Sequence, residues 1–224
     1  MPLTYTYTRE YVGMTSSNAT MYGIVTTIPA AFKKAGVTIS GTISSSTSNS
    51  AVGWRVAVEG TLRYKVNGGT QQDLKYITDS KTGGSLNVSG TFSITLDMTN
   101  VTKIGFNYAA AITKAHTGSS GPSSFSPSFT HRMVINFSLP SDIATETIIT
   151  ANKVNEIAGV VGANTSASVG SVIKVAQYNA LATAVGSSAF DSTKPLAANM
   201  TTLLSAVNSA SIAKSWDSTD AGDY

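Results

Sequence analysis

The sequence has no cysteine and only two histidines, His116 and His131. Disulfides, thiolate nucleophiles and zinc–thiolate sites are therefore excluded, and so is a histidine-rich metal centre. Charged residues make up 12% of the 224 residues, about half of the usual share of roughly 25%. The formal net charge is only +3, and the basic residues are scattered along the chain. Nucleic-acid-binding proteins usually concentrate them in a stripe or patch, so we expect no nucleic-acid partner and no metal cofactor.

Long apolar runs are missing as well. No segment approaches the roughly 18 consecutive apolar residues of a membrane helix. The first residues, MPLTYTYTRE, lack the basic stretch and the apolar run of a secretion signal. We therefore expect a chain that is made in the cytoplasm and that has no membrane partner.

Residues 1–140 show the alternation of apolar and polar side chains that is typical of strands with one buried face. Apolar side chains occupy every second position at 54–58, 92–98 and 133–139. Clusters of Gly, Ser and Asn separate these segments, as expected of many short strands joined by turns. This region therefore predicts a mainly antiparallel β-sandwich or a jelly-roll-like domain.

The composition changes after residue 140, where alanine becomes frequent and the alternation stops. A repeat with a spacing of 24 residues follows, in which IITANKVNEIAGVVG is matched by VIKVAQYNALATAVG. Apolar positions in each copy follow the i, i+3, i+4, i+7 spacing of one helix face, and each copy ends in a glycine, Gly162 or Gly186. The pattern predicts helices over about 151–161 and 175–185.

A third helix is expected at about 195–212, where Pro195 suits the first helical turn and apolar residues recur on one stripe. Helices of about a dozen residues are marginal in isolation. These three must therefore pack on each other, on the β region or on another subunit. The sequence predicts an α+β protein, with a β-sandwich domain at 1–140 and a region of short helices at 141–224.

The two copies of the repeat place an asparagine at the same register, Asn155 in the first and Asn179 in the second. Ile157, Tyr178 and Leu181 lie on the apolar stripes beside them. One interpretation is that these five residues contact a neighbouring subunit. The other is that each asparagine hydrogen-bonds the backbone of a nearby loop, which also explains the recurrence because both helices would use the same docking geometry.

The paired segments resemble an element of virion structural proteins of tailed bacteriophages, notably those of cyanophage-like myoviruses. The matching residues are Ile149, Thr150, Ala151, Asn155 and Ile157 in the first half, and Ile173, Tyr178, Asn179 and Leu181 in the second. Lys174 and Val175 depart from the pattern, and residues 163–170 replace a glycine-rich linker. The resemblance covers a short part of the chain. It implies a component of the tail, neck, baseplate or fibre, located in the virion, with other virion structural proteins as partners.

Catalytic patterns are absent from the sequence: there is no G-x-S-x-G elbow, P-loop, dinucleotide-binding motif or EF-hand loop. We therefore expect no enzymatic activity and no cofactor. A hydrolase that uses His116 or His131 is a third alternative. The terminal acids Asp217, Asp220 and Asp223 are expected on a frayed terminus, although their spacing also allows contact with a cation.

The leading hypothesis is a non-enzymatic structural component of a tailed-phage virion that forms homo-oligomers, because a low charge density suits extensive subunit contacts. The alternatives are a receptor- or glycan-binding fibre module and a capsid decoration protein. In the binding alternative, aromatic side chains would stack on a cell-surface glycan, although filling of the core is the stronger expectation for them. The aromatic candidates are Tyr5, Tyr7, Tyr11, Tyr22, Trp54, Tyr64 and Tyr76.

Overall fold

The computed structural model describes residues 2–15, 18–47, 51–118, 124–144, 150–217 and 221–224. The strands are β1 (Thr4–Met14), β2 (Asn18–Val25), β3 (Val37–Thr47), β4 (Trp54–Val66), β5 (Gln72–Thr82), β6 (Leu86–Leu96), β7 (Ile104–His116), β8 (Phe129–Ser138) and β9 (Ser211–Lys214). The helices are α1 (Ala151–Val161), α2 (Val175–Ala184) and α3 (Leu196–Ser209), with 3₁₀ turns η1 (Ala30–Phe32) and η2 (Ala221–Asp223).

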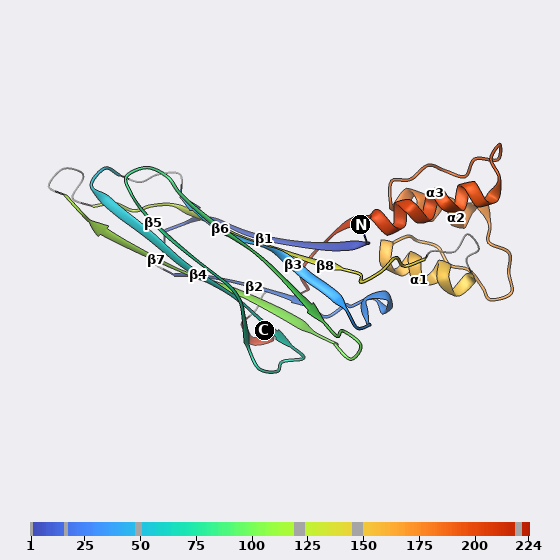
Figure 1. The fold of residues 1–224 in the computed structure, drawn as a ribbon, viewed down its shortest axis with the longest axis horizontal. Coiled ribbons are helices and arrows are strands. Elements are labelled where there is room, and N and C mark those ends of the chain that lie inside the picture. Colours follow the sequence, from blue (N-terminus) through green and yellow to red (C-terminus); the bar gives the residue numbers. More distant parts are fainter. Residues whose placement is uncertain (1, 16–17, 48–50, 119–123, 145–149, 218–220) are drawn as a thin grey trace.

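The strands form two facing sheets, with the three helices gathered at one end of the molecule (Figure 1). One sheet has the order β6-β3-β8-β1-β9 and the other has the order β2-β7-β4-β5. The first eight strands pair only in antiparallel fashion, and β9 alone pairs parallel to its neighbour β1. The expected β-sandwich is therefore present, and its eight-strand order is that of a double-sheet jelly roll.

Alternation along each strand places the apolar side chains between the sheets. In β8, the side chains of Met133, Ile135 and Phe137 are buried, and those between them are more exposed. Each such strand hides one face and presents Thr, Ser or charged residues on the other. His131 lies on the same inner face of β8 and is fully buried, which makes it a polar residue inside the sandwich.

The first two helices have the ends that their sequences predict. The side chain of Thr150 accepts a hydrogen bond from the Lys153 backbone nitrogen at the start of α1, as an N-cap residue does. Gly162 follows α1 in the left-handed conformation, with φ of 74°. Gly186 lies two residues beyond α2 with φ of 66°, so both glycines stop a helix in a conformation that other residues rarely adopt.

The third helix is shorter than the expected 195–212, because it ends at Ser209 and the chain then becomes strand β9. The edge of β1 explains the difference. The Thr4 backbone nitrogen donates to the Ala210 oxygen at 2.9 Å, and β9 then pairs with β1 over four residues. An open sheet edge offers a row of unpaired backbone groups, and this tertiary pairing overrides the local helical pattern.

The helices pack directly on one end of the sandwich. The Tyr5 hydroxyl from β1 donates a hydrogen bond to the Val160 backbone oxygen in α1. Asn208 in α3 is buried, and its side-chain amide accepts from Ile143 at 2.9 Å and donates to Ala144 at 2.8 Å. Buried apolar residues of the strands and helices form one continuous cluster, so the two regions share a core.

After α3 the chain turns back along the sandwich as a segment that we call the C-terminal arm, residues 210–217 and 221–224. Beyond β9, the Trp216 ring lies between the rings of Tyr7 and Phe106, with centroid distances of 4.9 and 6.1 Å. These two rings come from opposite sheets. Gly23 on β2 makes the space, because a Cβ there would lie 2.5 Å from the indole. The arm therefore covers the opening between the edge strands β1 and β2.

Two further contacts hold the arm in place. The Asp217 carboxylate accepts hydrogen bonds from the Thr26 backbone and hydroxyl and from the Thr27 backbone. Burial by itself would raise the pKa of this carboxyl, but these donors outweigh it and hold the pKa below its usual value. The Tyr224 ring packs at 5.7 Å from Tyr22. The expectation of a frayed terminus is therefore wrong for the described part of the arm, and Asp220 lies outside the described residues.

Replacing Trp216 by alanine will lower the free energy of unfolding by roughly 2–3 kcal/mol, less than the roughly 3–5 kcal/mol for a fully buried large aromatic residue, because the indole is only half-buried. Hydrogen exchange will show lost protection at the β9 amides. The matched control is Trp54→Ala, since this other half-buried tryptophan contacts His116 and Phe125 far from the arm. Unchanged β9 protection in Trp216→Ala would contradict the bridging role of the indole.

Candidate functional site

The repeated asparagines hold the loops that follow their helices. The Asn155 amide donates to the Ala167 oxygen at 2.9 Å and accepts from the Ala167 nitrogen at 2.7 Å. In the second copy, Asn179 accepts from the Phe190 nitrogen at 2.8 Å. Each asparagine thus bonds a backbone group eleven or twelve residues further along the chain. This is the arrangement of the loop-docking interpretation.

The other three predicted contact residues lie inside the helical region. Ile157, Tyr178 and Leu181 are all buried. The Tyr178 hydroxyl donates to the Asn199 backbone oxygen at 2.8 Å, and its ring meets the Phe190 ring edge-on at 5.5 Å. These side chains join the helices to each other. Direct contact of the five residues with a partner stays a prediction, and any effect of theirs on a partner passes through the loops that they hold.

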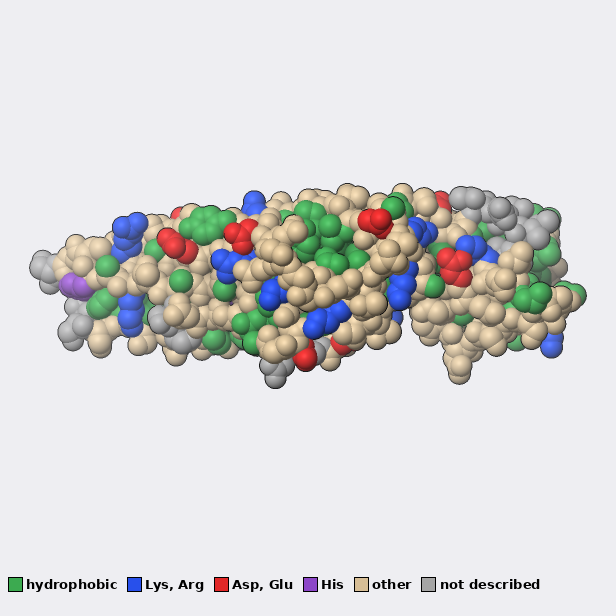
Figure 2. Space-filling model, turned by 90° about the horizontal axis from the view of Figure 1, so that it is seen from below, with side chains coloured by type: hydrophobic (Ala, Val, Ile, Leu, Met, Phe, Trp, Pro, Cys, Tyr) green, Lys and Arg blue, Asp and Glu red, His purple; other side chains and the backbone are tan. Residues whose placement is uncertain are grey.

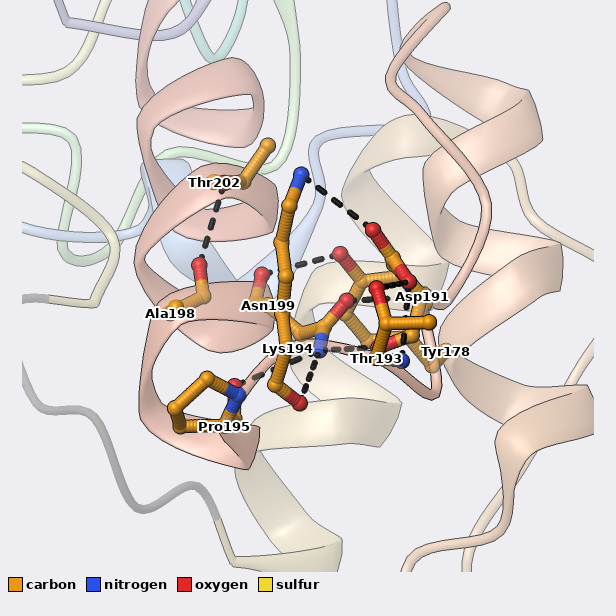
Figure 3. A network of polar contacts seen from close by, with 8 residues as sticks. All are labelled: Tyr178, Asp191, Thr193, Lys194, Pro195, Ala198, Asn199 and Thr202. Atoms are coloured by element: carbon orange, nitrogen blue, oxygen red, sulfur yellow. Dashed lines mark hydrogen bonds and ion pairs between the residues drawn. The ribbon is translucent and has the colours of Figure 1, made fainter.

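A third asparagine, Asn199 in α3, also bonds the backbone of a loop, in this case the loop before its helix (Figure 3). This residue was not identified from the sequence. Its side chain accepts from the Asp191 nitrogen at 2.8 Å and donates to the Asp191 oxygen at 2.9 Å. Asp191 in turn accepts from the Thr193 hydroxyl and backbone and pairs with Lys194. Figure 3 shows that Asn199 of α3 bonds the loop at Asp191 and that Tyr178 of α2 bonds the backbone of Asn199. Asn179 of α2 bonds the same loop at Phe190, so side chains of both helices fix the loop between α2 and α3.

A polar chain crosses the interior of the sandwich. The Ser45 hydroxyl lies 2.6 Å from the Tyr108 hydroxyl and 2.7 Å from His131 Nδ1. His131 Nε2 has no hydrogen-bond partner among the described residues, and its ring stacks on Phe129. Burial lowers the pKa of His131, which keeps the imidazole neutral.

The spacing of Ser45 and His131 is that of a nucleophile and its base. Both side chains are fully buried, however, so no substrate reaches the hydroxyl in this conformation. The second histidine, His116, lies at the exposed end of β7 beside Trp54. The chain Tyr108–Ser45–His131 is therefore a buried polar element of the core rather than an accessible pair.

A shallow trough of about 350 Å³ lies on the outer face of the sheet β2-β7-β4-β5. Cross-strand pairing explains its shape. Ala109 and Ala111 on the middle strand β7 lie between Asn18 and Thr20 on β2 and Glu59 and Thr61 on β4, which pair with them. Small side chains flanked by larger ones leave a depression along β7. The lining residues are Asn18, Ala19, Thr20, Glu59, Thr61, Arg63, Tyr76, Ala109, Ala110 and Ala111.

The trough ends toward the C-terminal arm. The Tyr224 ring lies over Gly105, where an added Cβ would meet it at 3.0 Å, and the Lys65 ammonium lies 4.4 Å above the same ring. Between Gly105 and Ala109, Asn107 is buried and its Oδ1 has no hydrogen-bond partner among the described residues. The arm thus covers one part of the face and leaves the alanine floor open.

The aromatic candidates for ligand contact differ in exposure: Tyr76 is exposed, and Tyr11, Tyr22 and Trp54 are half-buried. Tyr5, Tyr7 and Tyr64 are buried in the core, which confirms the expectation for these three residues. Tyr76 is 54% exposed and lies beside the trough. Sequence reasoning could not separate it from the others, because the choice depends on which face of β5 points outward.

Within the described ranges, no three acidic or histidine side chains come together closely enough to bind a metal ion. No helix among those residues has the length and apolar character needed to span a bilayer.

No protein-family model matches the chain, and no curated protein matches its sequence. Among solved structures, it is similar to Desmodium yellow mottle tymovirus, with 11% identity and a TM-score of 0.28 over 65% of this chain and 93% of that one. It is also similar to Eiger TNF from S. frugiperda, with 9% identity and a TM-score of 0.27 over 66% of this chain and 99% of that one.

A third similar structure is a Bacillus endospore appendage of disulfide-linked pili, with 12% identity and a TM-score of 0.24 over 61% of this chain and 87% of that one. These scores and identities are too low to carry an argument about function. The evidence for the fold is the strand order itself.

Replacing Asn155 by alanine will lower the free energy of unfolding by about 1–3 kcal/mol, because it leaves the buried backbone groups of Ala167 without partners. Limited proteolysis will cut the loop between α1 and α2 faster. Asn164→Ala, an exposed position in the same loop, is the control. Equal stability of the two variants would contradict the loop-holding role of Asn155.

The depressed pKa of His131 predicts a pH-dependent stability. Below about pH 6.5 the unfolded chain binds a proton at this position and the folded chain does not. The free energy of unfolding will therefore fall as the pH is lowered from 7 to 5. Urea titrations will show a flatter dependence for His131→Leu and the wild-type slope for His116→Ala. Parallel slopes for wild type and His131→Leu would contradict the assignment.

Proposed function

We propose that the chain is a non-enzymatic structural component of a tailed-phage virion, which docks through its helical end on a neighbouring virion protein. The tail, neck, baseplate and fibre are the locations that the resemblance of the repeat favours. A jelly-roll sandwich is compatible with this role, since the same architecture builds capsid and lectin domains.

The observation that carries the proposal is a set of exposed apolar side chains in the helical region. We call it the helical tip and define it by Val169, Val172, Val175 and Leu196. Val169 and Val172 are 80% and 84% exposed, and Leu196 is 65% exposed. The start of α3 and part of the loop between α1 and α2 lie at the end farthest from the sandwich (Figure 1). Hydrophobic side chains show at this end in Figure 2.

The fixed conformation of the loop between α1 and α2 supports a docking role. Hydrogen bonds from Asn155 to Ala167 and from Gln177 to Ser166 hold this loop, which carries Val169 and Val172. Apolar side chains held out by a fixed loop form a preorganised contact surface, which reduces the entropy lost on binding. Exposed apolar patches with a polar rim typically mark protein–protein contacts.

The charges beside the helical tip favour a different protein over a second copy as the occupant. Lys174 and Lys194 are the basic residues nearest to its apolar residues in the sequence, and Lys194 is paired with Asp191. Two copies meeting tip to tip would bring lysines together, which disfavours association. An apolar partner surface that carries carboxylates fits better. Self-association of the sandwiches into a homo-oligomer is a separate part of the proposal.

The test compares two highly exposed valines, Val172 and Val52. Val172→Glu places a carboxylate on the helical tip and will reduce incorporation into particles at least tenfold, because it opposes the acidic partner. Val52→Glu makes the same change on the sandwich, where Val52 is 73% exposed, and will leave incorporation unchanged. Virus that lacks the chain is complemented with each variant, and purified particles are quantified by mass spectrometry.

Two results would count against the proposal: wild-type chain that is absent from purified particles, or Val172→Glu incorporated as well as Val52→Glu. Gold labelling of intact particles with an antibody to the chain then distinguishes the locations. Label on the tail, neck or baseplate supports the proposed docking, whereas label spread over the head favours the capsid decoration alternative.

A further inference from the structure

The trough on the outer face of the β2-β7-β4-β5 sheet has the chemistry of a binding site that the structural role does not use. Its floor is apolar, since Ala109 and Ala111 contribute only methyl groups. Its volume of about 350 Å³ lies at the lower end of the range of small-molecule sites, roughly 300–1,000 Å³. Its floor follows β7 from Ala109 to Ala111, and this elongated shape suits an extended ligand better than a compact one.

The walls of the trough carry hydrogen-bonding groups of several kinds. Glu59 is exposed and has no ion pair or hydrogen bond among the described residues, so both carboxylate oxygens can accept. Arg63 uses Nε for Asp73 at 2.8 Å, and its terminal nitrogens have no partner among the described residues. Thr20 and Thr61 lie on either side of Ala109 and each brings a hydroxyl group to the lining.

These groups lie in a regular array because the strands set their spacing. Alternate residues on one strand are about 6.5–7 Å apart along the chain direction, and neighbouring strands are about 4.8 Å apart. Glu59, Thr61 and Arg63 therefore form one wall with an acceptor, a hydroxyl and a donor in sequence. A ligand that carries many hydroxyl groups at short intervals can use all three.

The ring of Tyr76 adds an apolar face beside Glu59, Thr61 and Arg63. This residue pairs with Thr61 across β4 and β5, so its ring lies at the side of the trough, with 54% of the residue exposed. The C–H face of a pyranose ring packs on such an aromatic side chain, which offers an apolar body with a polar tip. Hydroxyl groups and an apolar ring face together are characteristic of a sugar.

The charges of the lining side chains indicate whether the sugar is neutral or charged. Among the described residues, the charged side chains that line the trough are Glu59 and Arg63, which carry opposite charges, and Arg63 is also paired with Asp73 outside the trough. A charged sugar would be attracted by one of these two lining groups and repelled by the other. A neutral sugar can form hydrogen bonds with both groups, and bonds to charged groups are stronger than those between neutral ones.

We propose that this trough binds a neutral oligosaccharide, with the pyranose face on Tyr76 and hydroxyl groups on Glu59, Thr61 and Arg63. The proposal does not depend on the docking of the helical tip, because the two surfaces share no residue. It gives the chain a second contact, with a glycan, besides its contact with a neighbouring protein.

The test fills the trough without disturbing the core. A glycan array of neutral and acidic oligosaccharides identifies a bound probe, and calorimetry with the best neutral probe measures its dissociation constant. Ala111→Leu raises the floor and will weaken binding at least tenfold. Ala115→Leu is the matched control, because Ala115 is exposed on the same face of the same strand and lies outside the trough. It will leave affinity unchanged.

Two further variants test the chemistry of the site. Tyr76→Ala removes the stacking ring and Glu59→Gln removes the charged acceptor, and each will weaken binding at least fivefold. Tyr11→Ala changes a half-buried tyrosine on the other sheet and serves as their control. Amide NMR spectra of every variant confirm the fold and will show probe-induced shifts at Ala109 and Ala111.

Three outcomes would overturn the proposal. The first is the absence of binding to every neutral oligosaccharide on the array. The second is binding confined to acidic glycans, which would make Arg63 an anion site. The third is neutral binding that Ala111→Leu does not weaken, which would place the ligand elsewhere. Particle incorporation of Ala111→Leu at the wild-type level separates these results from a failure of the docking proposal.

Discussion

The opening between β1 and β2 is the place where the sandwich depends on the rest of the chain. Two sheets packed face to face share an apolar interior that reaches the solvent wherever their edge strands are uncovered. Trp216 lies in this opening between rings of both sheets, while β9 bonds to β1 and the Asp217 nitrogen bonds to Ile24. Because the arm begins where α3 ends, the same contacts hold the helices against the sandwich.

The local patterns of the sequence account for part of the secondary structure. Alternation over 54–58, 92–98 and 133–139 corresponds to β4, β6 and β8, and the repeat with its glycines corresponds to α1 and α2. Strand β9 could not be predicted in this way, because its four residues carry no pattern that distinguishes a strand from a helix end. Its conformation is decided by the free edge of β1, which is more than 200 residues away in the chain. The pairing of β9 with β1 is a tertiary contact, which local sequence patterns do not reveal.

The candidate sites differ in the same way. The asparagines at 155 and 179 were visible because they recur at one register, and the loop-docking interpretation followed from the chemistry of a mid-helix amide. The trough was not visible, because no two of its strands are adjacent in the sequence except β4 and β5. In the sequence, nothing distinguishes Ala109 and Ala111 from other small residues. Only strand pairing places polar side chains on both sides of them. Likewise, His131 is identified as buried only when Ser45 and Tyr108 are placed against it.

Residues 196–217 and 221–224 lie between the surfaces on which the two proposals rest. Leu196 belongs to the helical tip, α3 leads from there to the sandwich, and the arm ends with Tyr224 over Gly105 beside the trough. Three contacts hold the described part of this path: Asn208 at the junction, Trp216 between the sheets and Asp217 at β2. A subunit that is anchored by its tip would therefore hold the trough in a defined position relative to its neighbour. Release of the arm would alter both the packing of the helices and the end of the trough. The two surfaces therefore have no residue in common, but both depend on the position of the arm.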